Sequence, residues 1–271
     1  MIRVAWLTDI HLNFLRPEEQ EHFLASVRDT RPDALLISGD IGEAHNVVAF
    51  LNRMAMAWPC PIWFVLGNHD FYFGSIAEVR QRVQTLCREE PRFRYLTDCS
   101  VEELTSDVGL VGHDGWADAQ LGDYERSTVM MNDYRLIAEL AGYSKQGRLS
   151  ALRAMGQEAG EHVRRCLAQA FECYREVFLV THVPPLREAC WHEGRTSDDE
   201  WLPHFTCQAV GHALIDVARR HPDRRLTVLC GHTHGAGQTR PLPNVHVLTG
   251  GAVYGAPQIQ RIFELTHPGA A

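Results

Sequence analysis

Apolar runs of strand length alternate with segments of helical periodicity over the first 90 residues. The runs at 2–7, 33–38 and 62–66 are largely continuous, and the third is ended by Gly67. Continuous apolar runs of this length indicate strands buried on both faces, as in parallel sheets. Between and after them, apolar residues recur at helical spacing, which predicts helices at 17–30, 44–58 and 75–90. The alternation predicts an α/β fold.

The second part of the chain is less regular. It predicts short strands at 93–96, 101–104 and 108–112 with a hairpin turn at Ser106-Asp107, a helix at 149–174, a strand at 177–180, a helix from 204 or 205 to 220, and strands at 225–230, 245–249 and 258–265. Gly156 and Gly160 are expected to loosen the long helix, because glycine disfavours helix interiors. From Pro268 onward we expect a frayed tail. Segments 113–149 and 184–204 follow neither period, so we interpret them as insertions or cap loops of one domain covering 1–271.

The composition limits the class of partner. The net charge of −8 disfavours a nucleic-acid or membrane-surface partner, because phosphate-rich surfaces attract basic proteins. No apolar run approaches the about 20 residues of a membrane span, and the N-terminus lacks the features of a signal peptide. The 8 cysteines include no CxxC pair, which favours reduced thiols. We therefore expect a cytoplasmic protein without a membrane partner.

Side chains that can bind metal follow five of the predicted strands. The set comprises Asp9, His11, Asp40, Asn68, His182, His232 and His234. The carboxyl ends of parallel strands share one edge of a sheet, so we expect these side chains to converge. Each motif alone has a plainer interpretation, since Asp-x-His, Gly-Asp and a lone Asn or His are common in turns and surface loops. Their repeated position after strands favours a metal site.

The kinds of donor narrow the choice of metal. Carboxylate, imidazole and amide ligands together suit Mn²⁺, Fe, Co²⁺ or Zn²⁺ better than Mg²⁺ or Ca²⁺. Cysteine is absent from the set, which argues against a structural zinc site. Seven ligands exceed the needs of one ion, so the set predicts two divalent ions about 3.5–4 Å apart that share one carboxylate.

A known family carries the same motifs in the same order. Asp9-Ile10-His11, Gly39-Asp40, Gly67-Asn68-His69-Asp70, His182 and Gly231-His232-Thr233-His234 resemble the motifs of the calcineurin-like metallophosphoesterases. The resemblance implies a four-layer α/β/β/α sandwich, with the irregular insertion 113–149 near the site. It also implies that Asp9, His11, Asp40 and His234 bind one ion, that Asp40, Asn68, His182 and His232 bind the other, and that Asp40 is the bridge.

The same resemblance implies a reaction. A hydroxide that bridges the two ions would attack phosphorus, and His69 would be the catalytic residue that stabilises or protonates the leaving oxygen. Glu43 stands where the family often has an aspartate and is one candidate to orient His69. Asp70 is another candidate, or else a side chain that only stabilises the turn.

The substrate class stays open at this point. Protein Ser/Thr phosphatases of the family carry arginine where this chain has Leu66, which disfavours a phosphoprotein, and the charge of −8 disfavours a nucleic acid. A small phosphorylated substrate remains, with a phosphodiester favoured over a phosphomonoester. Trp116 or Tyr124 is a candidate for stacking on a base, although packing within the insertion is the plainer interpretation. The alternative function is a catalytically inert binding or scaffold protein of the same fold, which the complete ligand set disfavours.

Overall fold

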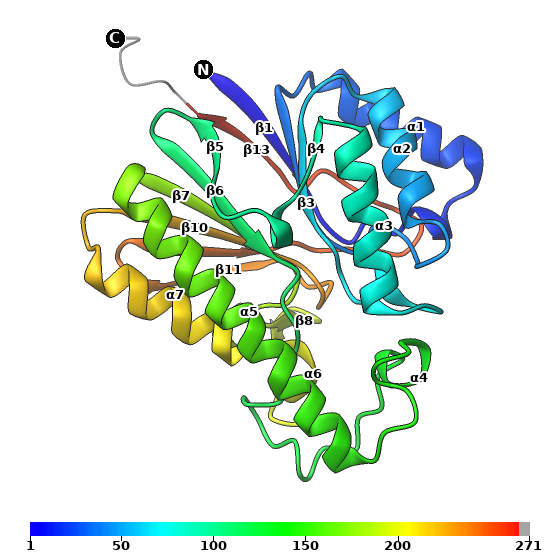
Figure 1. Ribbon diagram of the computed structural model, residues 1–271, viewed down its shortest axis with the longest axis vertical. Coiled ribbons are helices and arrows are strands. Elements are labelled where there is room, and N and C mark those ends of the chain that lie inside the picture. Colours follow the sequence, from blue (N-terminus) through cyan, green and yellow to red (C-terminus); the bar gives the residue numbers. More distant parts are fainter. Residues whose placement is uncertain (266–271) are drawn as a thin grey trace.

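Two large β-sheets stand at the centre of the molecule (Figure 1). The computed structural model describes residues 1–265, so the tail expected from Pro268 lies outside the described residues. The first sheet has the order β13 (Arg261–Leu265), β1 (Ile2–Leu7), β2 (Ala34–Ser38), β3 (Ile62–Val65) and β4 (Phe93–Tyr95). The second has the order β11 (Gly237–Leu242), β12 (Val245–Thr249), β10 (Arg225–Cys230), β7 (Glu176–Thr181), β6 (Val108–His113) and β5 (Glu102–Thr105). Within these sheets, only the edge strands β13, β11 and β5 pair in the antiparallel sense.

Helices connect the strands and cover the sheets. The long ones are α1 (Pro17–Asp29), α2 (Val47–Ala57), α3 (Ile76–Glu89), α5 (Lys145–Cys173) and α7 (Gln208–Arg220). The two insertions add short elements, which are α4 (Asp133–Leu136), α6 (Leu202–Phe205) and a hairpin of β8 (Trp191–His192) and β9 (Arg195–Thr196). Within residues 1–265, no helix combines the length and apolar character needed to cross a membrane.

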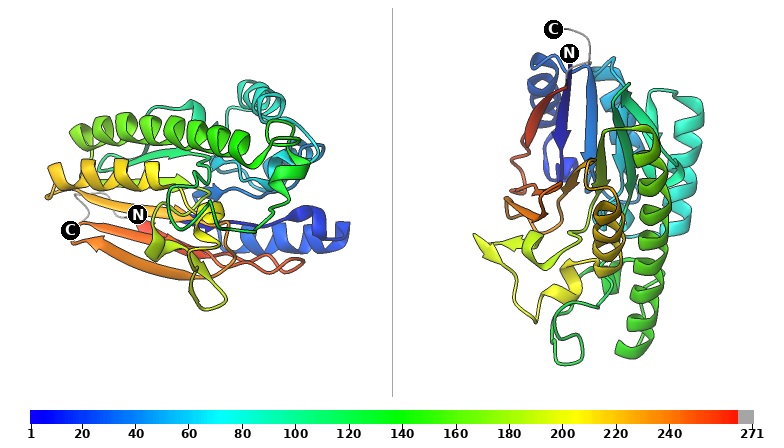
Figure 2. Two further views of the ribbon diagram at one scale, coloured as in Figure 1. Left: turned by 90° about the horizontal axis from the view of Figure 1, so that it is seen from below. Right: turned by 90° about the vertical axis from the view of Figure 1, so that its left-hand side faces the viewer.

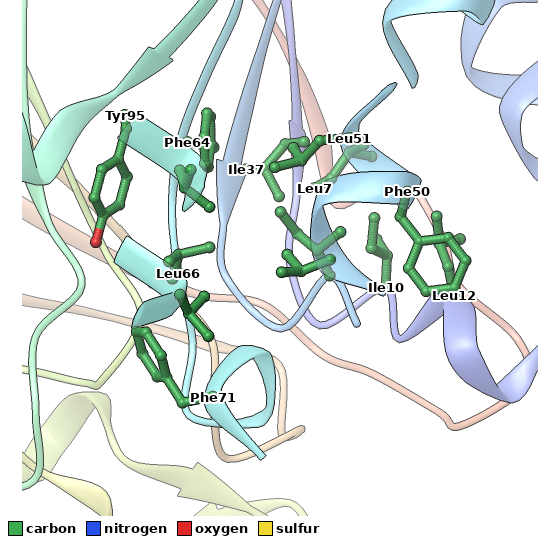
Figure 3. Close-up of a cluster of buried hydrophobic side chains, with 14 of the residues drawn as sticks. Leu7, Ile10, Leu12, Ile37, Phe50, Leu51, Phe64, Leu66, Phe71 and Tyr95 are labelled. Atoms are coloured by element: carbon green, nitrogen blue, oxygen red, sulfur yellow. The ribbon is translucent and has the colours of Figure 1, made fainter. Parts of the chain in front are cut away.

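Each large sheet packs against helices on one face and against the other sheet on the opposite face. Leu7 and Ile37 lie beside Leu51 of α2 in the core between the first sheet and its helices (Figure 3). Their strand neighbours Trp6 and Leu36 point to the other side and pack with residues of the second sheet, because side chains alternate along a strand. On the far side of the second sheet, α5 and α7 run side by side (Figure 2). The predicted α/β fold is confirmed.

The long helix differs from its prediction. It begins at Lys145 rather than near 149, because the hydroxyl of Ser144 accepts a hydrogen bond from the amide of Gly147 and caps the helix. Gly156 and Gly160 do not loosen it. A Cβ at Gly160 would lie 2.9 Å from the backbone of Ala209, so this glycine allows α5 and α7 to approach closely.

Several other boundaries differ from the predictions. The helix expected from 204 or 205 is divided into α6 and α7, because Thr206 is extended and its carbonyl accepts a hydrogen bond from the amide of Asp118. Helix α2 begins at Val47 rather than 44, and β13 begins at Arg261 rather than 258. Strand β11 was not predicted, because an edge strand with one solvent-exposed face carries few apolar residues.

Trp116 and Tyr124 are 5% and 6% exposed and belong to the hydrophobic core beside the first sheet, so they are unavailable for stacking on a base. All eight cysteines lie within the described part of the chain and are free.

Candidate metal centre

The predicted ligands meet where the two sheets adjoin, at the carboxyl ends of β1, β2, β3, β7 and β10. Backbone hydrogen bonds link the loops, since the amide of Asp9 donates to Gly39 (3.0 Å) and the amide of His11 donates to Asp40 (2.9 Å). The amide of Gly231 donates to His182 (2.9 Å), which joins the loops of the second sheet. The ends of five strands therefore form one surface.

Backbone strain is concentrated at this surface. Asp9, His11, Asp40, His232 and His234 all have positive φ, at 48°, 40°, 54°, 72° and 57°. Non-glycine residues seldom adopt this left-handed conformation, which costs of order 1–3 kcal/mol per residue and therefore persists only where the surroundings impose it. Five of the seven predicted ligands share it, which is a frequent property of functional sites.

The first group of donors converges on one point. Asp9, His11, Asp40 and His234 each offer one ligand atom, and these atoms lie within 4.8 Å of one another. Nε2 of His11 and Nε2 of His234 face each other at 3.2 Å. The carboxylates lie beside them, with 3.4 Å from His234 Nε2 to Asp9 Oδ1 and 3.6 Å from His11 Nε2 to Asp40 Oδ2.

A second group adjoins the first and shares Asp40 with it. Oδ2 of Asp40 lies 3.4 Å from Nε2 of His182, and it is the same oxygen that faces His11. The amide oxygen of Asn68 lies 3.0 Å from His182 Nε2 and 2.9 Å from His232 Nδ1. The backbone amide of His69 donates to the other oxygen of Asp40 (2.9 Å), which directs Oδ2 between the two groups.

Hydrogen bonds outside the two groups set the tautomers of the histidines. Nδ1 of His182 donates to the carbonyl of Ser38 (2.8 Å), so its Nε2 is the nitrogen turned toward Asp40 and Asn68. Nε2 of His232 donates to the carbonyl of His204 (3.2 Å), so its Nδ1 carries the lone pair. Partners of this kind orient the ligating histidines of metal sites.

The amide of Asn68 is oriented in the same way. Its Nδ2 donates to Asp133 Oδ1 (2.9 Å) and to the hydroxyl of Tyr72 (3.1 Å), which leaves Oδ1 directed at the histidines. The Tyr72 hydroxyl in turn donates to Asp133 Oδ1 (2.7 Å). Asp133 lies in the insertion 113–149, so that insertion reaches into the metal centre.

The charges at the site suit divalent cations. Burial acts to raise the pKa of Asp40, but the charges of His182 and His69 hold it well below its ordinary value, so the carboxylate is ionised. Burial lowers the pKa of His11 and of His232 to about 4, so both rings are neutral at pH 7. At the other two rings burial is outweighed by the nearby carboxylates of Asp40 and Asp9, which raise the pKa of His182 to about 10 and also raise that of His234, so a cation bound there would replace a proton. Ionised carboxylates and neutral imidazoles are the forms that bind metal. The donors present therefore fit two adjacent divalent ions.

Glycines allow the loops to come this close. A Cβ at Gly67 would overlap Oδ1 of Asp40, and a Cβ at Gly231 would overlap the carboxylate of Asp9. A larger residue at either place would displace a predicted ligand.

His69 lies at the edge of the site and not within the two groups of donors. Its ring stacks on Tyr72, with centroids 4.2 Å apart, and its Nε2 lies 3.5 Å from the hydroxyl of Tyr254. Its Nδ1 is buried and has no hydrogen-bond partner among the described residues.

The two acids considered as partners of His69 lie elsewhere. Asp70 is fully buried and accepts hydrogen bonds from the amides of Ile41, Gly42 and Gly67 (2.8–2.9 Å), so it stabilises the turns after β2 and β3. Glu43 has its carboxylate near His45, 3.8 Å from Nδ1. In the described part of the chain, neither acid hydrogen bonds His69.

A cavity of about 580 Å³ opens over the two groups of donors. Asp40, Asn68, His69 and His232 form part of its lining, and both insertions contribute to the remainder. From the sequence we did not predict the contributions of Asp133 and of the His204 carbonyl. Asp133 is not part of a recognisable motif. Every residue has a backbone carbonyl, so the sequence does not indicate that the carbonyl of His204 has a particular role.

Comparison with known proteins agrees with this geometry. A family model described as calcineurin-like phosphoesterase matches residues 2–236. A probable cyclic nucleotide phosphodiesterase from Pseudoalteromonas sp. is 30% identical over 82 residues, which are 26% of this chain and 31% of that protein. A UDP-2,3-diacylglucosamine hydrolase from Stenotrophomonas maltophilia is 33% identical over 82 residues, which are 26% of this chain and 33% of that protein. The matched part thus spans about a third of the length of these curated relatives.

Solved structures share the fold at low sequence identity. A phosphopantetheinyl hydrolase from Mycobacterium tuberculosis superposes with a TM-score of 0.62 at 16% identity, covering 92% of this chain and 89% of that chain. A dimetal phosphatase from Danio rerio gives a TM-score of 0.57 at 14% identity, covering 94% of this chain and 89% of that chain.

Proposed function

The chain belongs to the calcineurin-like phosphoesterase family, and from that premise we propose that it hydrolyses a small phosphodiester by means of two divalent metal ions. The ions are drawn from Mn, Fe, Co and Zn, which suit a mixed set of carboxylate, imidazole and amide donors. The observation that carries the proposal is the position of Asp40 Oδ2, which faces His11 at 3.6 Å and His182 at 3.4 Å. One oxygen between two sets of donors is the arrangement that a bridging ligand requires.

The proposed ligands divide into two sets. Asp9, His11, Asp40 and His234 would hold one ion, and Asp40, Asn68, His182 and His232 would hold the other. When bound, two such ions supply Lewis acidity and a hydroxide nucleophile at neutral pH.

His69 is the residue of the chain proposed to act on the leaving group. It lines the cavity next to Asn68, and its ring nitrogens make no hydrogen bond to either group of donors among the described residues. From this position the imidazole binds the leaving oxygen and delivers a proton to it as the ester bond breaks. The hydroxyl of Tyr254, 3.5 Å from Nε2, marks the side of the ring that faces the cavity.

A phosphodiester is favoured over a phosphomonoester by the charge of the cavity. A diester carries a single negative charge, whereas a monoester approaches two at neutral pH. Among the described residues that line the cavity there is no lysine or arginine, and Glu200 is present. The similarity to a protein named as a probable cyclic nucleotide phosphodiesterase supports the same choice.

Hydrolysis of two chromogenic esters tests the proposal. Protein stripped of metal and reloaded with Mn²⁺ should hydrolyse bis-p-nitrophenyl phosphate with a higher kcat/KM than p-nitrophenyl phosphate, and the stripped protein should hydrolyse neither. A preference for the monoester would identify a phosphatase instead. Binding of two ions without hydrolysis of either ester would favour the inert binding protein.

A further inference from the structure

Aromatic and sulfur-containing side chains line the cavity beside the metal centre. The segment 184–204 and the adjoining α6 contribute Trp201 and Phe205, and the insertion 113–149 contributes Met130 and Met131. The rings of Trp201 and Phe205 are stacked, with centroids 5.2 Å apart and planes 27° from parallel. Trp201 is 38% exposed and Met130 is 49% exposed, although side chains of this size are usually covered. Phe205 is buried behind this surface, whereas Trp201 and Met130 give the cavity an apolar surface that no part of the described chain covers.

This surface is continuous with the metal centre. The rings of Phe205 and His232 form a T-shaped pair, with centroids 5.3 Å apart and planes 89° from parallel. This row of ring contacts begins at a proposed metal ligand and continues to Trp201, and it lies where a group attached to a metal-bound phosphate would extend.

The surface is also held in place before any ligand binds. The hydroxyl of Thr128 donates to the carboxylate of Glu200 (2.7 Å), and the hydroxyl of Ser127 donates to the carbonyl of Glu200 (2.9 Å). Ser127 also hydrogen bonds Nε2 of His204 at 2.9 Å. These bonds join the two insertions directly beside Met130 and Trp201, and a rigid surface loses little entropy on binding.

The charge of the lining excludes a second phosphate as the bound group. Within residues 1–265, the cavity is lined by no lysine or arginine, and Glu200 contributes a carboxylate. Recognition of a further phosphate requires cationic donors. Aromatic rings and methionine instead attract flat, uncharged groups.

We propose that Trp201, Phe205 and Met130 form a subsite for an uncharged aromatic group esterified to the substrate phosphate, such as an aryl group or a nucleobase. This inference rests on the proposed function, because the phosphate is placed at the metal pair. Stacking on Trp201 provides the affinity, and the metal centre provides the position of the phosphate.

Binding of two phosphonates tests the subsite without any turnover. Phenylphosphonate and methylphosphonate differ only in the group offered to the subsite, and neither is hydrolysed. For the full-length Mn²⁺-loaded protein, calorimetry should give a Kd for phenylphosphonate about tenfold or more below that for methylphosphonate, the scale of one aromatic stacking contact. In Trp201→Ala this ratio should fall to about one, while the Kd of methylphosphonate stays unchanged.

Matched variants separate stacking from structural damage. Trp201→Phe keeps an aromatic ring and should retain most of the ratio, and Met130→Ala should reduce it. Tyr143→Ala removes an aromatic side chain that is 50% exposed in the same insertion but outside this cavity, and it should behave as the wild type. Equal Kd values for the two phosphonates in the wild type, absence of binding by both, or an unchanged ratio in Trp201→Ala would each overturn the proposal.

Failure of the proposed function has a different signature. If the phenyl preference is present and Mn²⁺-loaded protein hydrolyses neither chromogenic ester, the subsite stands and the hydrolase assignment fails. If bis-p-nitrophenyl phosphate is hydrolysed but the preference is absent, the hydrolase assignment stands and the subsite fails.

Discussion

Replacement of Asp133 by alanine should weaken metal binding although Asp133 is not a proposed ligand. Its Oδ1 accepts hydrogen bonds from Asn68 Nδ2 (2.9 Å) and from the Tyr72 hydroxyl (2.7 Å). The carboxylate is 5% exposed, so water does not readily replace it. In Asp133→Ala, the amide of Asn68 is free to rotate and present Nδ2 instead of Oδ1 to the second ion.

The expected magnitude follows from these two hydrogen bonds. Each hydrogen bond to a charged group contributes about 1.5–3 kcal/mol, and part of this energy holds Asn68 in its ligating orientation. Loss of a group that orients a ligand typically costs 10- to 100-fold in metal affinity, or about 1.4–2.7 kcal/mol. We therefore expect Asp133→Ala to bind the more weakly held Mn²⁺ about 10- to 100-fold less tightly.

Calorimetric titration of the stripped protein with Mn²⁺, supported by metal analysis after dialysis, measures this change. Asp133→Asn keeps an acceptor oxygen and should fall between the wild type and Asp133→Ala. Glu125→Ala removes an exposed acid from the same insertion and should bind both ions as the wild type does. Two ions bound by Asp133→Ala with wild-type affinity would refute the reasoning, because Asn68 would then need no support from the insertion.

Three further predictions concern other groups. His69→Ala should retain two ions while kcat for bis-p-nitrophenyl phosphate falls by about 10²-fold, the scale of a lost general acid, and an unchanged kcat would remove His69 from the mechanism. Asp40→Asn should hold at most one ion by metal analysis, and two ions held at wild-type affinity would show that Asp40 is not the bridge. Burial lowers the pKa of His113 from 6.5 to about 3. Below pH 6.5 the unfolded chain therefore binds a proton at His113 that the folded chain does not bind, so the free energy of unfolding decreases as the pH falls. At pH 5 this loss is about 2 kcal/mol relative to pH 8, so urea unfolding of His113→Asn should show a decrease smaller by that amount. The exposed-site control His22→Asn should keep the full decrease, and equal pH dependence of wild type and His113→Asn would contradict the burial of a neutral ring.

Local patterns were sufficient to predict the framework of the fold. Strands such as β2 (Ala34–Ser38) are buried on both faces, and burial on both faces favours a continuous apolar run that is visible in the sequence. The candidate ligands were identified for a related reason. Parallel strands bring their carboxyl ends to one edge, so the position of Asp9 or His232 directly after a strand already implies where its side chain lies.

Predictions were weakest where the chain follows no period. The glycines of the long helix were expected to loosen it, because helix propensity is a local property. Gly160 is instead required by the close approach of the backbone of Ala209, which lies in another helix. The break between α6 and α7 likewise depends on the amide of Asp118, which bonds to Thr206 from the distant insertion.

The sequence by itself determined which elements form and which donors follow them, because apolar periodicity and the order of polar residues are properties of neighbouring positions. Only the tertiary structure decided how those donors are oriented and what covers them. Asp133 directs Asn68, the carbonyl of His204 directs His232, and Trp201 borders the cavity. The two hydrogen bonds join residues that are 65 and 28 positions apart in the sequence. They depend on the paths of loops, and these paths are set by packing and hydrogen bonds between distant segments rather than by any local pattern.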